Sequence, residues 1–284
     1  MIMAIKNEFV NLVVNIEEKI NLDLISDAFF PKFLPTDMRR KFSNFGAIKL
    51  EDGSIGIVFI GLSQKIKKKV SNINIDTLIG INPVDLAKKF DSARELESTL
   101  ALGAINAISQ SIFKKVNYEF DFVSDSLGLL NLNDDDKVGM VGYFPPLVKK
   151  IEKMNIPLVV IEKKEFNIKT KENWEITLDP LKLKSCNKIL CTSTTVLNDS
   201  LDEILSYTKN AEKISMVGPT GGFLPDPIFQ RGVDVLGGTF IADSDLFIQL
   251  IRQNKKWGPA TRKYCIHAKN YKSYKNLIRS TINS

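Results

Sequence analysis

The feature that most constrains the fold is an alternation of short apolar runs with helical patterns after about residue 121. Strands that alternate with helices are typical of a parallel sheet covered on both faces. The sequence therefore predicts an α/β domain over the C-terminal half. The predicted strands span residues 137–143, 157–162, 188–192, 213–218 and 233–241.

The N-terminal part has a different pattern, which predicts a smaller α+β unit. Helical spacing of apolar residues predicts an amphipathic helix over residues 7–29. Asp52-Gly53 between two β-rich runs predicts a hairpin of residues 47–50 and 55–60. A long helix over residues 93–115 is apolar nearly all round, so it should lie in the core. Asn106 is its polar exception and needs partners, either in a structural hydrogen bond or in a ligand contact.

Composition limits the class of protein. The chain has 284 residues, of which 44% are hydrophobic and 25% charged, and no run approaches a membrane span. The first residues lack the pattern of a signal peptide, and three cysteines do not form a disulfide framework. We therefore expect a cytoplasmic protein without a membrane partner.

Positive charge is concentrated at the C-terminal end. Residues 252–284 contain nine Lys or Arg and no Asp or Glu, although the net charge of the whole chain is only +6. Basic residues interleaved with tyrosines can bind nucleic acid. The alternative is an amphipathic helix near residues 271–279 packed on the domain, which we favour, so nucleic acid is not the expected partner.

Residues 217–238 are punctuated by six glycines and three prolines. Glycine permits positive φ and close backbone approach, and proline stiffens the chain. Such a segment between two β-like runs predicts a shaped loop at the end of a strand, where α/β proteins bind ligands. An ordinary strand-to-helix turn is the alternative.

Two further loops should lie at the same sheet edge, because parallel strands share their carboxyl ends. They are residues 142–146 and 192–195, which join residues 218–222. The helix N-termini that follow such loops can bind an anion. The Thr and Ser residues could instead cap a helix that begins near Asn198. The predicted ligand-binding residues are Asn106, Gly142, Tyr143, Phe144, Pro145, Glu162, Thr192, Thr194, Thr195, Asn198, Gly218, Pro219, Thr220 and Asp226.

Glu162 enters this set because it ends a predicted strand 20 residues after Gly142. An acid at about that distance binds ribose in dinucleotide-binding folds, but the full G-x-G-x-x-G pattern is missing. Metal ligation has little support: Cys265 and His267 stand together, with no second pair at zinc-finger spacing. The only histidine of the chain also excludes His-rich hydrolytic metal sites.

Several segments together resemble the family described as "putative heavy-metal chelation". They are residues 93–97, 102–107, 138–147, 192–198 and 217–238. The resemblance implies an enolase-N-terminal-like α+β domain, a Rossmann-like domain and a site between them. The basic end beyond Trp257 lies outside the resemblance. We place the two domains at residues 1–120 and 121–284.

The function that we expect is binding of a small anionic ligand or metal complex in an interdomain cleft, in a heavy-metal chelation role. Whether it is catalytic stays open, as does self-association into a homo-oligomer. The alternatives are a nucleotide- or S-adenosylmethionine-dependent enzyme and a nucleic-acid-associated protein. A metal ion and a nucleotide-like ligand are both compatible as cofactors.

Overall fold

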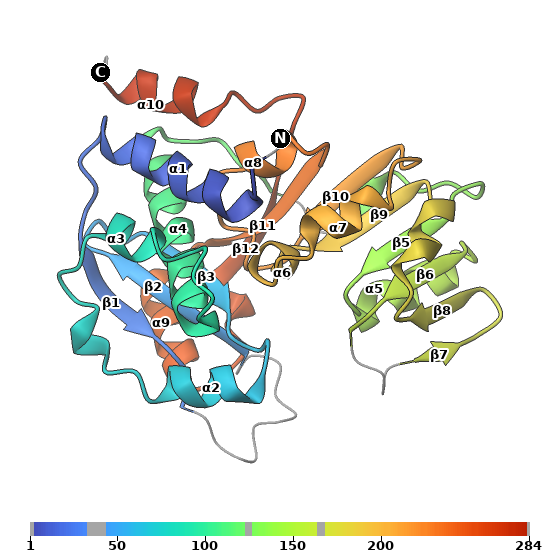
Figure 1. The fold of residues 1–284 in the computed structure, drawn as a ribbon, viewed down its shortest axis with the longest axis horizontal. Helices are drawn as coiled ribbons and strands as arrows, with labels where there is room; N and C mark the ends of the chain where they lie inside the picture. The colour runs from blue at the N-terminus through green and yellow to red at the C-terminus, as the bar shows by residue number, and fades with distance from the viewer. Residues whose placement is uncertain (1–2, 33–43, 123–126, 164–167, 283–284) are drawn as a thin grey trace.

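The computed structural model describes residues 3–32, 44–122, 127–163 and 168–282 (Figure 1). Within these ranges the strands form a three-stranded sheet, β1-β2-β3, and a nine-stranded sheet, β4-β12-β11-β10-β9-β5-β6-β8-β7. The expected mixed α/β architecture, with a large and mainly parallel sheet, is confirmed.

The N-terminal half packs helices on one face of the three-stranded sheet (Figure 1). Its elements are α1 (Ile5–Glu17), β1 (Ile25–Phe29), β2 (Phe45–Leu50), β3 (Ile55–Phe59), α2 (Gln64–Ser71), α3 (Pro83–Ala87) and α4 (Glu95–Lys115). The hairpin prediction is confirmed, and Gly53 has the positive φ of 85° that its turn requires. The helix predicted over residues 7–29 is wrong in its second half: the chain forms β1 there, because pairing with β2 buries Ile25, Ala28 and Phe29.

Helix α4 lies closely against β3. A Cβ atom on Gly56 would come within 2.2 Å of the Gly103 carbonyl oxygen and 2.3 Å of the Ala107 nitrogen. The small residues of α4 therefore allow the helix backbone to contact the strand backbone. This explains why the apolar helix is buried along most of its length.

The central strands of the larger sheet are parallel, as predicted, and its edges are antiparallel. The strands are β4 (Asp121–Phe122), β5 (Val138–Val141), β6 (Leu158–Ile161), β7 (Lys169–Thr170), β8 (Trp174–Thr177), β9 (Lys188–Thr192), β10 (Lys213–Val217), β11 (Val235–Ile241) and β12 (Thr261–His267). The helices are α5 (Pro145–Lys153), α6 (Thr194–Leu197), α7 (Leu201–Ser206), α8 (Asp226–Phe229), α9 (Ser244–Arg252) and α10 (Tyr274–Ile282). Short 3₁₀ turns occur at η3 (Ile75–Thr77), η4 (Gly128–Leu130), η6 (Pro180–Ser185) and η7 (Gly258–Ala260).

The basic C-terminal end is an integral part of the fold. Strand β12 pairs with β11 along seven residue pairs and with β4 on its other side. Helix α9 packs on the three-stranded sheet, where Phe247 and Ile251 contact the cluster that contains Phe29 and Ile57. Helix α10 lies on the side of α1 and α4 (Figure 1). The end of the chain thus packs against both halves, and the proposed boundary at residue 120 stays a prediction.

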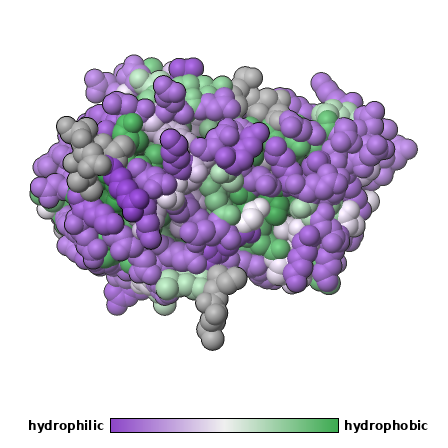
Figure 2. All heavy atoms as spheres, turned by 90° about the horizontal axis from the view of Figure 1, so that it is seen from above, coloured by the Kyte–Doolittle hydropathy of each residue, from purple (hydrophilic) through white to green (hydrophobic). Residues whose placement is uncertain are grey.

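Most of the face in Figure 2 is hydrophilic, with apolar atoms gathered toward the middle of the view. No helix in the described ranges combines the length and apolar character needed to cross a bilayer.

Candidate functional site

The three predicted loops lie side by side, because β5, β9 and β10 are neighbours in the sheet. The first loop is residues 142–146, the second is residues 192–195 and the third is residues 218–222. A Cβ on Gly142 would lie 3.1 Å from Thr192 Cγ2, and one on Gly218 would lie 2.6 Å from Ser193 Oγ. Both glycines also have positive φ, 89° and 138°. Glycine is therefore needed at both positions for the loops to contact one another.

The third loop is also fixed to the N-terminal half. The Phe59 amide donates to Thr220 Oγ1 at 3.1 Å, and Asn106 Nδ2 donates to the Thr220 carbonyl at 2.9 Å. Asn106 Nδ2 also donates to the Ile57 carbonyl at 2.7 Å. Thr220 and Asn106 are both fully buried. In the structure these two predicted site residues join β3, α4 and the glycine-rich loop.

A cavity of about 240 Å³ lies beside the first and third loops. Its walls are largely apolar or backbone, with two polar side chains on neighbouring strands, Thr239 and Lys263, which are partners in the β11–β12 register. Among the described residues, Lys263 makes no ion pair or side-chain hydrogen bond. The lining residues are Leu129, Phe144, Pro146, Leu147, Val217, Gly218, Pro219, Gly237, Gly238, Thr239, Lys263 and Tyr264. We call this hollow the rim cavity.

A second and larger hollow, of about 670 Å³, lies between the two halves. The β2–β3 turn and the end of α4 form one side, and β4, β11 and β12 form the other. Arg262 lies over the Phe122 ring in this hollow, 3.8 Å from its centroid. None of its described lining residues belongs to the three loops, whereas all those of the rim cavity follow residue 120. The structure thus separates two features that the sequence analysis had combined: a rim formed by loops and an interdomain cleft.

The helix that follows the first loop begins with few free amides. Pro145 and Pro146, at the first two positions of α5, have no N–H. The next two amides, of Leu147 and Val148, donate to the Phe144 carbonyl at 2.9 and 3.0 Å. The expectation of free amides at this helix N-terminus therefore does not hold for the described start of α5.

The second loop bonds mainly to itself. Thr192 Oγ1 and Thr194 Oγ1 are 3.0 Å apart, and Thr195 Oγ1 donates to the Thr192 carbonyl at 2.8 Å. Asn198 Oδ1 accepts from the Ser200 amide and hydroxyl at 3.2 and 2.6 Å. Asn198 ends the short helix α6, and the next helix, α7, begins at Leu201 with Ser200 at its N-cap position.

Of the fourteen predicted residues, three belong to the described lining of the rim cavity: Phe144, Gly218 and Pro219. The remaining ones include Glu162, Tyr143 and Asp226. Glu162 follows β6 and accepts a hydrogen bond from the Lys163 amide. Tyr143 is half-buried against the apolar cluster of the C-terminal half. Asp226 is buried and accepts from the Tyr271 hydroxyl at 2.7 Å and the Tyr274 amide at 3.0 Å. Burial raises the pKa of Asp226, although these hydrogen bonds oppose the shift.

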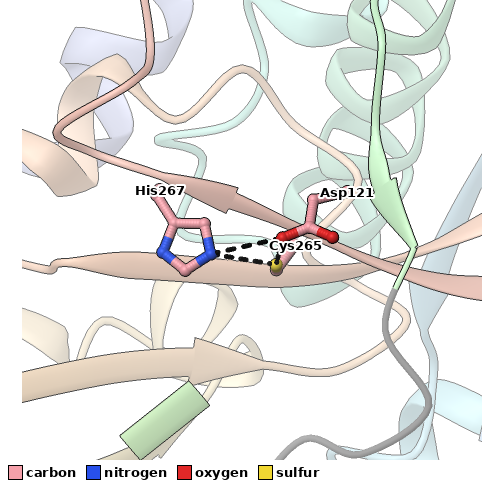
Figure 3. A group of neighbouring side chains, drawn as sticks. All are labelled: Asp121, Cys265 and His267. Atoms are coloured by element: carbon pink, nitrogen blue, oxygen red, sulfur yellow. Dashed lines mark hydrogen bonds and ion pairs between the residues drawn. The ribbon is translucent and has the colours of Figure 1, made fainter. Parts of the chain in front are cut away.

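A cluster that the sequence analysis missed lies at the edge of the large sheet (Figure 3). Asp121 on β4 is paired with Cys265 on β12, and His267 follows two residues later on the same face. Burial, followed by the hydrogen bond to Asp121, raises the pKa of the Cys265 thiol to about 12. The sequence shows that Cys265 and His267 are neighbours, but only the pairing of β4 with β12 brings Asp121 to them.

Comparison with known proteins supplies the family. Residues 125–270 match the model of the DUF364 family, described as "Putative heavy-metal chelation". The chain belongs to this family. An uncharacterised protein from Methanocaldococcus jannaschii is 31% identical over 190 residues, which cover 64% of this chain and 69% of the relative.

Two solved structures of DUF364 proteins of unknown function have the same fold. The protein from Desulfitobacterium hafniense gives a TM-score of 0.69 at 19% identity, over 93% of this chain and 97% of that one. The protein from Pyrococcus horikoshii gives 0.65 at 19% identity, over 93% and 98%. At this identity the likeness concerns the fold alone.

Proposed function

We propose that this DUF364 protein binds a small anionic ligand, free or as the chelator of a metal ion, in the rim cavity. The observation that carries the proposal is Lys263, an ammonium without a carboxylate partner among the described residues, on a cavity that also presents the Thr239 hydroxyl. A concave, mostly apolar site with a few convergent polar groups is the usual form of a small-ligand site.

The lining chemistry limits the ligand. The described lining contains one cation, one threonine hydroxyl and one tyrosine, beside apolar side chains such as Leu129, Phe144 and Leu147. This composition suits an apolar body with one carboxylate better than a ligand with several phosphates. It offers no thiol, imidazole or carboxylate, so a metal ion in this cavity would have to arrive with its own chelator.

A nucleotide-dependent enzyme is the second candidate, favoured by the neighbouring parallel strands β5 and β6, which are followed directly by Gly142 and Glu162. A dinucleotide site of this type binds its pyrophosphate at the helix N-terminus after the first strand. Pro145 and Pro146 remove the first amides there, which counts against this candidate.

The test compares an anion with its neutral analogue. Benzoate should raise the melting temperature of the wild type, and benzamide should not, because only the carboxylate pairs with Lys263. At ten times its Kd, benzoate should stabilise the fold by about 1.4 kcal/mol. Lys263→Met should lose the response. The matched control is Lys269→Met, which removes an exposed lysine outside the cavity lining.

An equal response of the two lysine variants to benzoate would contradict the proposal, as would the absence of any response to benzoate and to inorganic phosphate. A response to phosphate alone that is lost in Lys263→Met would support the rim cavity as the binding site, but it would contradict a carboxylate as the ligand.

A further inference from the structure

A thiol, an imidazole and a carboxylate converge at the β4–β12 edge of the large sheet (Figure 3). Cys265 Sγ lies 3.3 Å from Asp121 Oδ2 and 3.3 Å from His267 Nε2, and the last two atoms are 3.5 Å apart. The three side chains come from two paired strands, so the backbone hydrogen bonds of the sheet fix their relative positions.

These separations match the edges of a tetrahedral coordination shell. Bonds from zinc to sulfur, nitrogen and oxygen of roughly 2.0–2.3 Å place neighbouring ligand atoms roughly 3.3–3.6 Å apart. A small shift of the side chains therefore suffices to place an ion of this size at bonding distance from all three atoms.

From this geometry we propose that Asp121, Cys265 and His267 form a binding site for a thiophilic metal ion of the zinc or cadmium class. Thiolate and imidazole ligands select such ions, whereas magnesium and calcium prefer all-oxygen sites. No fourth His, Cys, Asp or Glu joins the group within the described chain. Three protein ligands leave one coordination position for water or an exchangeable ligand. Catalytic zinc sites have this open position, whereas structural zinc sites have four protein ligands.

The exposure of the ligands suits an ion that enters from solvent. The side chain of Asp121 is 62% exposed and that of His267 is 24% exposed, whereas Cys265 is buried beneath them. Two ligands at the surface can capture the ion, and the thiol then holds it from the inner side.

The inference does not rest on the proposed function, because none of the three ligands lines the rim cavity. Cys265 is nevertheless paired with Gly237 and lies two residues from Lys263, both of which line that cavity. A metal ion and an anionic ligand would thus be bound on neighbouring parts of β12, roughly 7 Å apart along the strand.

The test uses Co(II) on the protein of residues 1–284. The wild type should bind one equivalent and show the near-ultraviolet charge-transfer band of a Co(II)–thiolate bond. Excess Cd(II) should abolish the band, and excess Mg(II) or Ca(II) should not. Cys265→Ser should eliminate it. His267→Gln and Asp121→Asn should each lower the affinity for Co(II) by at least about tenfold, since mutation of residues that only hydrogen-bond to metal ligands already has an effect of that size.

The single histidine of the chain provides an independent readout that needs no assignment. Addition of Zn(II) should shift the His267 ring resonances in a long-range ¹H–¹⁵N spectrum, and this shift should be lost in Cys265→Ser. Cys186→Ala, which removes a buried thiol elsewhere, and Lys263→Met are the controls, and both should retain the Co(II) band.

Unmoved His267 resonances together with no charge-transfer band would overturn the proposal, as would a band that survives in Cys265→Ser. Near-ultraviolet circular dichroism of Asp121→Asn and His267→Gln shows whether these more exposed ligands were changed without loss of the fold.

Discussion

Asp226 is a buried carboxylate that fastens the C-terminal end of the chain. Its two oxygens accept hydrogen bonds from the Tyr271 hydroxyl and the Tyr274 amide, at the start of α10. The sequence placed Asp226 among ligand-binding candidates, and that assignment stays a prediction. The contacts of the described residues give it a structural role, because both of its partners belong to the protein.

The stability of the fold should depend on the protonation of Asp226. Burial raises its folded pKa above the unfolded value of about 3.9. Between these two values the folded protein binds the additional proton, so the contribution of Asp226 to the free energy of unfolding falls as pH rises through the window. Tyr271 faces the carboxylate, and Lys275 opposes the shift.

The measurement is urea unfolding of the wild type and Asp226→Asn from pH 4 to pH 7. The stability of the wild type relative to the variant should decrease with rising pH and level off above the folded pKa. Asp245→Asn, at an exposed aspartate, should show no such trend. A relative stability of the wild type that increases with pH would contradict a raised pKa of Asp226 in the folded protein.

At the scale of elements, the contact between α4 and β3 organises the N-terminal half. Gly56 lies so close to the backbone of Gly103 that its position has no room for a side chain, whereas a Cβ on Gly103 would make a tight contact of 3.1 Å with the Ile48 side chain. The sequence predicted both elements from local patterns. It did not indicate that the small residues of the helix meet a glycine of the strand, since that contact joins residues far apart in the chain.

Gly56→Ala should destabilise the fold by about 3 kcal/mol, because the added methyl group would overlap backbone atoms of α4 that cannot move away separately. Chemical denaturation gives the change in the free energy of unfolding. Gly258→Ala is the matched control: no atom lies within 4 Å of its added Cβ. Equal stability of the two variants would show that α4 is not packed on β3 as described.

For the whole molecule, the C-terminal end decides whether the two halves form one unit. Strand β12 is inserted between β4 and β11, α9 covers the small sheet, and α10 lies against the N-terminal helices. A helix near residues 271–279 was predicted, and α10 confirms a helix there, three residues later at each end. The sequence analysis did not predict β12, although its alternation buries Tyr264 and Ile266 on one face and Cys265 on the other.

A chain that ends at Trp257 should therefore lose its cooperative thermal transition, because it lacks a strand of the large sheet and the partners of Asp226. Lys269→Glu, Lys272→Glu and Arg279→Glu combined should leave the melting temperature nearly unchanged, since all three side chains are exposed. Circular dichroism melting compares the two proteins. A truncated chain that melts like the wild type would contradict the integral role of β12.

The same two proteins also test the alternative function of nucleic-acid binding, because one loses part of the fold and the other loses only positive charge. Loss of binding after truncation could result from unfolding alone, whereas the triple charge reversal lowers the charge of residues 252–284 from +9 to +3 in a folded protein. Binding that falls steeply with salt and disappears in the triple variant would support that alternative.

The sequence by itself determined the features that depend on local periodicity and turn chemistry. These are the hairpin at Asp52-Gly53, the buried helix around Asn106, the parallel strands and the glycine-rich loops at one sheet edge. Only the tertiary structure decided which distant side chains come together. Lys263 and Thr239 meet at the rim cavity, and Asp121 joins Cys265 and His267, because β12 pairs with β11 and β4. Such pairings depend on the burial of both faces of a strand and on backbone bonds between distant segments, which no local pattern specifies.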